Sequence, residues 1–396
     1  MSKTLLVLAA STYQVPTIQA AKALGYRVVT TDNVAANPGH ALADASFGVD
    51  TTDPEGVLAL ARAERIDGII APGTDVAVET AAYVAEQLGL PGPSVQAART
   101  LTRKRLFREF LRDAELPCPV VLDAAEATGR KADSLLRESR WLVKPNRSSG
   151  SKGVFIVDDA AELGRRVVES RGFSVDGEAL LEELVEGTQH TCEGFVQNGR
   201  LALVLVTDRD TVAAPHTATC GHRVPSRLGE RRQREAVGAI EQVLRLTNIA
   251  SGPVDCDFVV GPERIVVIEM TPRLGGNSLS RLFEAALDFD LLAAAVRHAC
   301  GDVVSLPPQR RPKPAAIAIL GVERAGRIAW DAAQADALAL EPWLESLLFD
   351  VAQGQQVGAF VNGRHRIGEA LVVGATRDEV DARLAELARR LHLRAD

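Results

Sequence analysis

Short apolar segments alternate with helical stretches at the start of the chain. Residues 4–10 (TLLVLAA) and 26–31 (YRVVTT) have the composition of buried strands, and the helical stretch 15–24 lies between them. A helix at 54–65 and a further strand at 66–71 (IDGIIA) repeat the alternation. Strands that alternate with helices form a parallel sheet with helices packed on its faces, so the chain is predicted to begin with a doubly wound α/β domain.

Two features argue against a ligand at the edge of this first sheet. The turn after the first predicted strand, AASTYQVP, contains no glycine. A dinucleotide-binding turn needs GxGxxG so that the backbone can approach the pyrophosphate, and we therefore expect no nicotinamide cofactor. Asp75, in PGTDVAVE, is expected to be the N-cap of a helix at 75–88 rather than a ligand.

The overall composition indicates a globular protein without a strong electrostatic field. The 396 residues are 46% hydrophobic and carry a formal net charge of -7. Such a chain is long enough for two or three domains, and its charge does not attract nucleic acid or an anionic membrane surface. The five cysteines form no CxxC pair, so a disulfide framework and a zinc site are not expected. A cytoplasmic location is predicted, and the sequence contains no apolar run long enough for a membrane span.

Two proline-rich segments divide the chain. LPCPVVL follows a predicted helix at 102–114, and PPQRRPKP lies at 307–314; proline interrupts helices and central strands. Between these segments the sequence predicts strands and hairpins with interspersed helices, an α+β pattern. The last predicted helix begins at Thr376, with a capping-box spacing to Glu379. The predicted units are residues 1–115, 116–308 (subdomains about 116–186 and 187–308) and 309–396.

Residues 141–153 read WLVKPNRSSGSKG, an apolar strand that ends in a lysine and a loop of small residues. The loop does not match the Walker pattern GxxxxGK[ST], but its N–H groups and hydroxyls can turn toward phosphate oxygens. The loop residues concerned are Ser148, Ser149, Gly150, Ser151 and Gly153. Lys144 should point into a cleft, because burial of an unpaired charge is costly. Taken alone, the segment also fits an ordinary turn between two strands.

The sequence SGPVDCDFVVGPERIVVIEMTPRLGG, residues 251–276, contains two strands joined by a short turn. If they pair so that opposed residue numbers sum to 526, Asp257 faces Glu269. Carboxylates directly opposite one another repel, so a compensating charge is expected. Mg²⁺ is one candidate, since it binds carboxylates and bridges them to nucleotide phosphates. A solvated sheet edge, or neutralisation by Arg273, is the alternative.

Between these two segments lies LLEELVEGTQHTCE, residues 180–193. An acidic doublet before a strand is consistent with a sheet edge at which the backbone of Glu183 and Val185 pairs with a purine. Glu182 would then accept a hydrogen bond from the exocyclic amine of that purine. A solvated helix face explains the same pattern, because acidic doublets are common in helices.

In their order and spacing these segments resemble the ATP-grasp superfamily, and the resemblance covers nearly the whole chain. Residues 99–119 look like the junction before that family's nucleotide-binding domain, with Lys104 in the place of the first ATP lysine. Lys144 and its loop match the second lysine and the mobile phosphate loop. EELVEG matches the adenine hinge, and DFVVGPERIVVIEMTPR matches the metal-binding strands followed by an arginine. The resemblance implies an α/β and α+β fold in three parts: an N-terminal biotin-carboxylase-like parallel-sheet domain, an ATP-grasp domain and a small C-terminal α+β domain.

This resemblance also implies an activity. Enzymes of this kind use ATP and Mg²⁺, for which Mn²⁺ can substitute, to convert a carboxylate into an acyl phosphate that an amine then attacks. Lys104 and Lys144 would hold the α- and β-phosphates. Asp257 and Glu269 would bind the metal, and Arg273 would stabilise the acyl phosphate and the tetrahedral intermediate. The role of the protein in such chemistry is positioning and charge neutralisation.

Within the superfamily the chain looks most like the carboxylate–amine ligases that join amino acids. The similarity lies in IEMTPRLGGNSLSRLFEAALDFDLLAAAVRHACG, in the preceding GHRVPSRL and in residues 357–376. Small-molecule carboxylate and amine substrates are therefore expected, and a homodimer would be usual for the family. A purine-pathway or carboxylating enzyme of the same fold, or an ATP sensor without catalysis, is the alternative. The chain has Gln189 where a glutamate usually binds the ribose, and Thr271 where many members have a metal-binding asparagine.

The segment 208–229 is predicted to be a long polar loop, and such loops are often lids over active sites. His216 and His222 within it are candidates to contact the substrate, although a lone histidine in a loop is often merely exposed. Asn277 and Arg273, which follow the second metal-binding strand, are further candidates.

Overall fold

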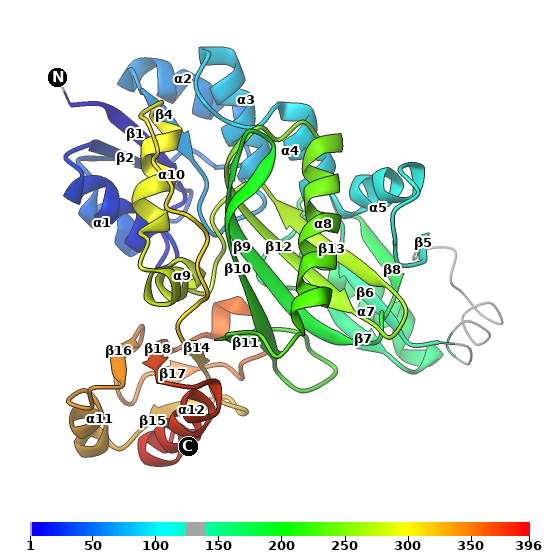
Figure 1. Ribbon diagram of the computed structural model, residues 1–396, viewed down its shortest axis with the longest axis vertical. Coiled ribbons are helices and arrows are strands. Elements are labelled where there is room, and N and C mark those ends of the chain that lie inside the picture. The colour runs from blue at the N-terminus through cyan, green and yellow to red at the C-terminus, as the bar shows by residue number, and fades with distance from the viewer. Residues whose placement is uncertain (1, 124–135, 137–138) are drawn as a thin grey trace.

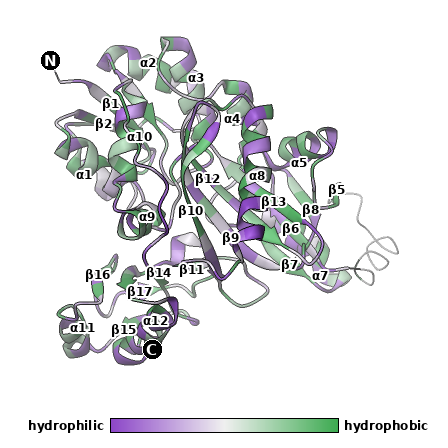
Figure 2. Cartoon of the chain, viewed as in Figure 1, coloured by the Kyte–Doolittle hydropathy of each residue, from purple (hydrophilic) through white to green (hydrophobic). Residues whose placement is uncertain are grey.

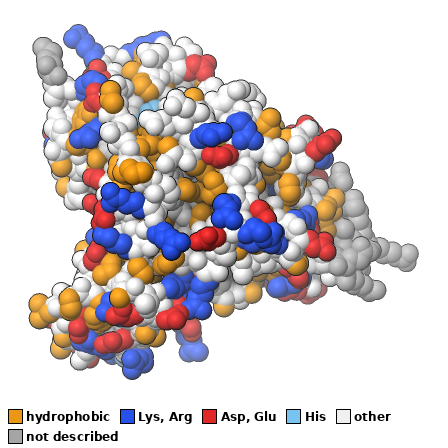
Figure 3. Space-filling model, viewed as in Figure 1, with side chains coloured by type: hydrophobic (Ala, Val, Ile, Leu, Met, Phe, Trp, Pro, Cys, Tyr) orange, Lys and Arg blue, Asp and Glu red, His pale blue; other side chains and the backbone are white. Residues whose placement is uncertain are grey.

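The computed structural model describes residues 2–123, 136 and 139–396. Figure 1 shows an N-terminal α/β domain in blue, a central region built on a long sheet in green, and a C-terminal unit in orange and red. On the face shown in Figure 3, acidic and basic side chains are interspersed. Among the described helices, none has the length and apolar character needed to cross a membrane.

The N-terminal domain contains the predicted parallel sheet. Its strand order is β3-β2-β1-β4, with bounds β1 Thr4–Leu8, β2 Arg27–Thr31, β3 Ala45–Phe47 and β4 Gly68–Ile70. The surrounding helices are α1 Val15–Ala23, η1 Pro38–Leu42, α2 Pro54–Glu64, α3 Val78–Leu88 and α4 Val95–Thr102. Leu5 and Val7 of β1 pack in one core with α1 and α10 (Leu291–Ala299), whereas Leu6 and Leu8 pack in another with α2 and α3. Because helices cover both faces of the sheet, every residue of β1 is buried.

The central region consists of two antiparallel sheets. The smaller sheet has the order β5-β8-β6-β7, with bounds β5 Val121–Asp123, β6 Trp141–Pro145, β7 Phe155–Val157 and β8 Ala179–Glu183. The larger sheet has the order β13-β12-β9-β10-β11-β14-β18-β16. Its first five strands are β13 Ile265–Thr271, β12 Ser251–Val260, β9 Thr188–Gln197, β10 Arg200–Thr211 and β11 Thr219–Val224. The strands of both sheets pair antiparallel throughout, as hairpins of adjacent segments favour.

The helices of the central region are α5 Lys104–Asp113, α7 Ala160–Arg171, α8 Glu230–Leu246 and α9 Leu279–Leu287. Helix α8 is amphipathic, and Figure 2 shows hydrophilic and hydrophobic residues alternating along it. Its buried residues, Ala236, Ile240, Val243 and Leu244, have the spacing of one helix face and pack against the large sheet.

The C-terminal unit extends the large sheet. It supplies strands β14 Ala315–Leu320, β18 Gly368–Val373 and β16 Leu344–Phe349, a small sheet of β15 Gly326–Ala329, β17 Gln356–Val357 and β19 Arg394–Ala395, and helices α11 Ala332–Leu338, η2 Gly363–His365 and α12 Arg377–Leu391. Because Ala315 of β14 lies opposite Val224 of β11, the sheet continues across the proline-rich linker. Thr376 caps α12 by accepting a hydrogen bond from Glu379 N at 3.2 Å.

The hairpin β12–β13 brings the two predicted metal-binding carboxylates together. Asp257 lies opposite Glu269, as predicted. Beyond Asp257 a β-bulge shifts the register by one residue, so that Phe258 faces Val267. The predicted register is therefore correct at the carboxylates and wrong toward the turn. The extra residue is Ile268, which lines one of the cavities of the site.

Candidate functional site

Two cavities meet at the carboxylate pair of the hairpin. The larger has a volume of about 810 Å³ and is lined by the N-terminal domain, the large sheet and the C-terminal unit. The smaller has a volume of about 120 Å³ and lies between the two central sheets. Asp257 and Glu269 line both cavities, so groups bound on either side can meet at these carboxylates.

The smaller cavity gathers almost all of the residues that were predicted to bind ATP. Those lining it are Lys104, Lys144, Ser148, Ser149, Gly150, Ser151, Glu182, Glu183, Val185 and Gln189. Leu142 from the small sheet and Phe258 and Ile268 from the large sheet add apolar walls. Gly153 is the exception, because a Cβ on it would lie 2.8 Å from Phe173, which shows that it packs against that ring instead.

A buried ion-pair network forms one wall of the smaller cavity. Glu182 accepts hydrogen bonds from Arg108 Nε at 2.8 Å and from Lys144, and all three residues are almost fully buried. Burial acts to raise the pKa of Glu182, but Arg108 and Lys144 outweigh it and lower the pKa to about 2. The carboxylate of Glu182 therefore positions Lys144. Its contact with a purine amine remains a prediction. Arg108, on α5, was not singled out from the sequence.

Nucleotide binding is expected to weaken as the pH rises through about 8. Burial lowers the pKa of Lys144 to about 8, although Glu182 acts in the opposite direction. Phosphate binds the ammonium form, so above this pH a proton must be taken up on binding, and the Kd for Mg·ADP should rise by up to about tenfold per pH unit. Lys144→Arg keeps its charge and should give a flatter profile. Calorimetric titrations from about pH 7 to about pH 9.5 measure the pH dependence of Kd for both proteins. Equal slopes would contradict the claim that the ammonium group of Lys144 binds phosphate.

The facing carboxylates are themselves partly neutralised. Glu269 accepts a hydrogen bond from Lys104 Nζ at 3.3 Å, and Asp257 pairs with Arg209 at 3.0 Å. Burial acts to raise the pKa of Glu269, but Lys104 and other nearby cations lower it, so the carboxylate is charged. Arg273, the alternative partner, forms its own ion pairs with Asp75 and Asp255 and lowers the pKa of Glu269 only from a distance.

The donor atoms at this position suit a hard divalent cation. Two carboxylates that face each other across a hairpin supply the oxygen ligands that Mg²⁺ prefers. Thr271, two residues beyond Glu269, lines the larger cavity, and its buried Oγ1 has no hydrogen-bond partner within the described residues. The described part of the chain contains no group of three His, Cys, Asp or Glu side chains arranged around a metal position. Further ligands would therefore be hydroxyl, water or phosphate oxygens.

The loop between β6 and β7 separates the two cavities. Ser149, Gly150 and Ser151 line both of them. Gly150 has φ 65°, a conformation that glycine adopts without strain. Its carbonyl accepts a hydrogen bond from the N–H of Gly363 at 2.9 Å, which ties the loop to the C-terminal unit.

Arg273 connects the large sheet to the N-terminal domain. Its guanidinium is buried in the wall of the larger cavity and donates to Asp75 and, at 2.5 Å, to Asp255. The prediction that Asp75 is a helix N-cap is wrong. Helix α3 begins at Val78 after Ala77, which makes no side-chain cap, and the carboxylate of Asp75 instead orients Arg273.

Asp255 belongs to the site although the sequence analysis did not single it out. It lies opposite Thr271 and two residues before Asp257, so both aspartates are on one face of β12. Burial raises the pKa of Asp255 to about 7, although Arg273 acts in the opposite direction. The D-x-D spacing in VDCDF was the signal available, because alternate residues of a strand share a face.

The segment 208–229 is not the long loop that was predicted. Strands β10 and β11 run through most of it and leave a short turn. His222, on β11, lines the larger cavity and is 1% exposed, and burial together with Arg209 lowers its pKa to about 3, so it is neutral. His216 lies in the turn beside Phe155 and lines neither cavity.

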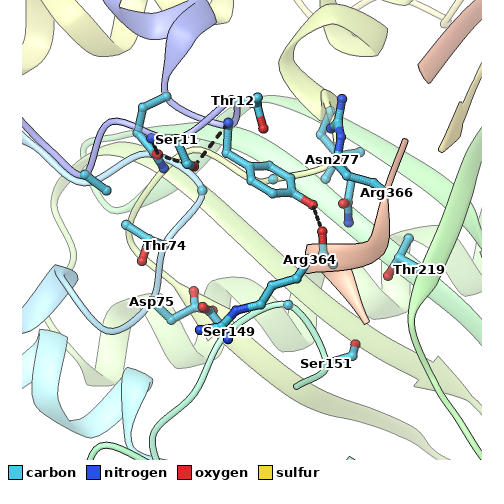
Figure 4. A pocket seen from close by; sticks show the side chains of 18 of the residues that line it. Ser11, Thr12, Thr74, Asp75, Ser149, Ser151, Thr219, Asn277, Arg364 and Arg366 are labelled. Carbon is cyan, nitrogen blue, oxygen red and sulfur yellow. Dashed lines mark hydrogen bonds between the residues drawn. The ribbon is translucent and has the colours of Figure 1, made fainter. Parts of the chain in front are cut away.

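The C-terminal unit contributes side chains that the sequence analysis did not identify. Arg364 and Arg366 line the larger cavity, and Figure 4 shows Arg366 beside Asn277, which was predicted to contact the substrate. The guanidinium of Arg366 lies 5.1 Å from the ring centroid of Tyr13, whose hydroxyl donates to the carbonyl of Gly363 at 2.9 Å. The sequence GRHR at 363–366 signals a basic cluster, but only the fold places that cluster in the cavity.

Three family models match successive parts of the chain. Residues 18–92 match an ATP-grasp N-terminal domain, residues 139–281 an ATP-grasp domain, and residues 318–396 the L-amino acid ligase C-terminal domain 2. These regions correspond to the three parts of the fold and contain most of the residues that line the two cavities.

Comparison with whole proteins agrees with the family models. The chain is 26% identical over 309 residues to the uncharacterized protein y4rH of Sinorhizobium fredii (76% of this chain, 63% of that one), and 26% identical over 279 residues to carnosine synthase 1 of Homo sapiens (65% and 33%). The matches thus span less than two thirds of either relative. Among solved structures, the L-amino acid ligase from Bacillus licheniformis superposes with a TM-score of 0.82 at 17% identity (100% of this chain, 99% of that one), and phosphoribosylglycinamide synthetase from Anaerococcus prevotii with 0.77 at 19% (100% of both). The predicted resemblance and three-part fold are confirmed, and the chain is a member of the ATP-grasp superfamily.

Proposed function

We propose that the chain is an ATP- and Mg²⁺-dependent ligase that joins a carboxylate to an amine through an acyl phosphate. A carboxylate oxygen attacks the γ-phosphorus and ADP leaves; the amine then attacks the carbonyl carbon, phosphate leaves, and the nitrogen loses a proton. The observation that carries the proposal is the position of Asp257 and Glu269. They line both the cavity that contains the predicted ATP lysines and the larger cavity that contains Arg273.

The smaller cavity is proposed to hold the purine. Its apolar walls, which include Leu142 and Ile268, suit a flat ring, and the hinge backbone at Glu183 and Val185 supplies groups that can pair with its edge. The amide oxygen of Gln189 would accept a hydrogen bond from a ribose hydroxyl. Because the amide is neutral, this bond is weaker than one to the carboxylate of a glutamate. Since the cavity measures about 120 Å³, the phosphate tail would pass the two lysines and extend toward the larger cavity.

The facing carboxylates are proposed to hold the metal. Mg²⁺ at Asp257 and Glu269 would neutralise charge on the transferring phosphoryl group, and Mn²⁺ is expected to substitute. Lys104 and Lys144 would bind the α- and β-phosphates, and the unpaired hydroxyl of Thr271 would take the place of the usual asparagine.

Arg273 is proposed to stabilise the acyl phosphate and the tetrahedral intermediate. Asp75 and Asp255 hold its guanidinium in place before the substrate arrives, and such preorganisation is what makes a donor effective in the transition state. His222 and Asn277 line the same cavity and are proposed to contact the substrates. His216 lies outside that cavity, so it is not proposed again.

The substrates are proposed to be amino-acid-like. The family model matched by residues 318–396 is that of an L-amino acid ligase domain, and a relative of 26% identity is named carnosine synthase. A purine-pathway or carboxylating reaction is the second candidate, because phosphoribosylglycinamide synthetase has the same fold. A cytoplasmic location and a homodimer are further predictions.

A substrate screen tests the proposal. The amino acids are offered in pairs, with ATP and Mg²⁺, and release of phosphate and ADP is measured, with Lys144→Met as the inactive control. At least one pair should release ADP rather than AMP and yield an amide detectable by mass spectrometry. Turnover that requires bicarbonate would favour the second candidate. ATP binding without turnover of any pair would instead indicate a sensor and refute the ligase.

A further inference from the structure

Among the residues that the structure describes, Arg364 is a cation without a partner in the wall of the larger cavity. The other arginines that line this cavity each have a carboxylate partner: Arg209 pairs with Asp257, Arg273 with Asp75 and Asp255, and Arg366 with Asp350 and Glu369. The guanidinium of Arg364 forms no hydrogen bond or ion pair with any residue that the structure describes. In Figure 4 its side chain extends from the C-terminal turn toward Asp75 and Ser149.

Lys152, in the loop between β6 and β7, is a second cation of this kind. It lines both cavities, and its ammonium group also lacks a partner in the described part of the chain. Burial and the nearby charge of Arg364 lower the pKa of Lys152, although Asp75 acts in the opposite direction. Like charges in a partly buried cavity repel, so an anion bound between them would remove an unfavourable interaction.

The turn that carries Arg364 is held from three directions. Asn362 Oδ1 accepts a hydrogen bond from the N–H of Arg364 at 3.0 Å within the C-terminal unit. The N–H of Gly363 donates to the carbonyl of Gly150, and the carbonyl of Gly363 accepts from the hydroxyl of Tyr13, each at 2.9 Å. The turn is thus tied to the phosphate loop and to the N-terminal domain, and an arginine on an anchored turn loses less conformational entropy when it binds a ligand.

We propose that Arg364 and Lys152 bind an anionic group, a carboxylate or a phosphate, that one of the two substrates carries in addition to its reacting group. The proposal rests on the ligase function and deepens it by narrowing the substrates. It predicts that the enzyme prefers amino acids or phosphorylated compounds to acids and amines that carry no further anion. Arg364 lines only the larger cavity, whereas Lys104 and Lys144, which are proposed to bind the α- and β-phosphates, line only the smaller one. Arg364 is therefore assigned to a substrate rather than to these phosphates. A guanidinium can bind either kind of anion through two parallel hydrogen bonds.

Direct binding tests the site with succinate and inorganic phosphate as probes. The full chain is first saturated with Mg²⁺ and a non-hydrolysable ATP analogue, which fills the triphosphate site. One or both probes should then raise the Tm of the wild-type protein and of Arg389→Gln, a control on α12 with an exposed side chain, but not of Arg364→Gln. Equal responses in all three proteins, or no response in the wild type, would overturn the proposal. So would a response that appears only when the ATP analogue is left out.

Turnover distinguishes this proposal from the ligase function. With a pair that the wild type joins, Arg364→Gln should raise KM for the anion-bearing substrate by about 10- to 100-fold and leave KM for ATP unchanged. Masking the anion as an amide, as in glycinamide for glycine, should remove the difference, and Arg364→Lys should recover part of the affinity. Equal changes for masked and unmasked substrates would overturn the anion site alone. If no pair releases ADP, the ligase function fails, and the binding experiment then decides the anion site.

Discussion

Replacement of Arg273 by alanine is expected to remove most of the turnover and to destabilise the fold. Loss of a donor that acts in the transition state lowers kcat by about 100- to 1000-fold. The same change leaves Asp75 and Asp255 largely buried without their cation, and breaking a buried pair in this way lowers the free energy of unfolding by about 3 to 5 kcal/mol. Steady-state kinetics and urea denaturation measure the two effects.

A lysine at the same position separates catalysis from stability. Arg273→Lys keeps a positive charge between the two carboxylates, so most of the stability should return. A lysine has no planar fork and cannot hold both aspartates and the reacting group in the same geometry, so kcat should stay low. A folded Arg273→Ala protein with wild-type kcat would show that the arginine is only structural.

Glu269→Gln is expected to weaken metal binding by at least about 100-fold and to lower turnover accordingly, because even residues that merely support metal ligands change affinity by about 10- to 100-fold. The fold should tolerate the change. The substitution removes the repulsion between position 269 and Asp257, which stabilises the fold, and it also removes the ion pair with Lys104, which destabilises it. Because these effects oppose each other, the free energy of unfolding should change by no more than about 1 kcal/mol. Titration of Mn²⁺ in the presence of ADP, followed by electron paramagnetic resonance, measures the affinity without turnover.

A second glutamate on the same hairpin provides the control. Glu263 lies exposed in the turn between β12 and β13, so Glu263→Gln removes one negative charge without altering the carboxylate pair. It should bind Mn²⁺ as the wild type does. If Glu263→Gln and Glu269→Gln weaken the metal equally, overall charge and not coordination explains the effect, and the metal site is refuted.

Local sequence patterns were sufficient to predict the N-terminal parallel sheet and the carboxylate pair, but not strand β11 of the large sheet. Alternating strands and helices predicted the parallel sheet, because such segments can bury their apolar faces only against one another. The short turn predicted that Asp257 and Glu269 lie opposite each other in the hairpin, and the alternation of side chains along a strand predicted that they share a face. The bulge at Ile268 could not be predicted, since the residues of both strands between it and the turn are apolar in either register.

Long-range ion pairs could not be predicted from such patterns. Glu182 and Arg108 are 74 positions apart, and Arg273 and Asp75 are 198 apart. No local period relates these positions, so the sequence does not predict that Glu182 pairs with Arg108 or that Asp75 pairs with Arg273. Arg364 was missed for the same reason, because its cavity is formed by all three parts of the fold.

By itself the sequence determined the N-terminal alternation of strands and helices and the strand pairing at the two carboxylates, and its resemblance to a family predicted most of the polar residues around the smaller cavity. Only the tertiary structure decided which charges are paired, which are buried, and which remain free to meet a ligand. The physical reason is that periodicity acts between neighbours in the chain, whereas the role of a charge depends on its desolvation and on partners brought close by folding.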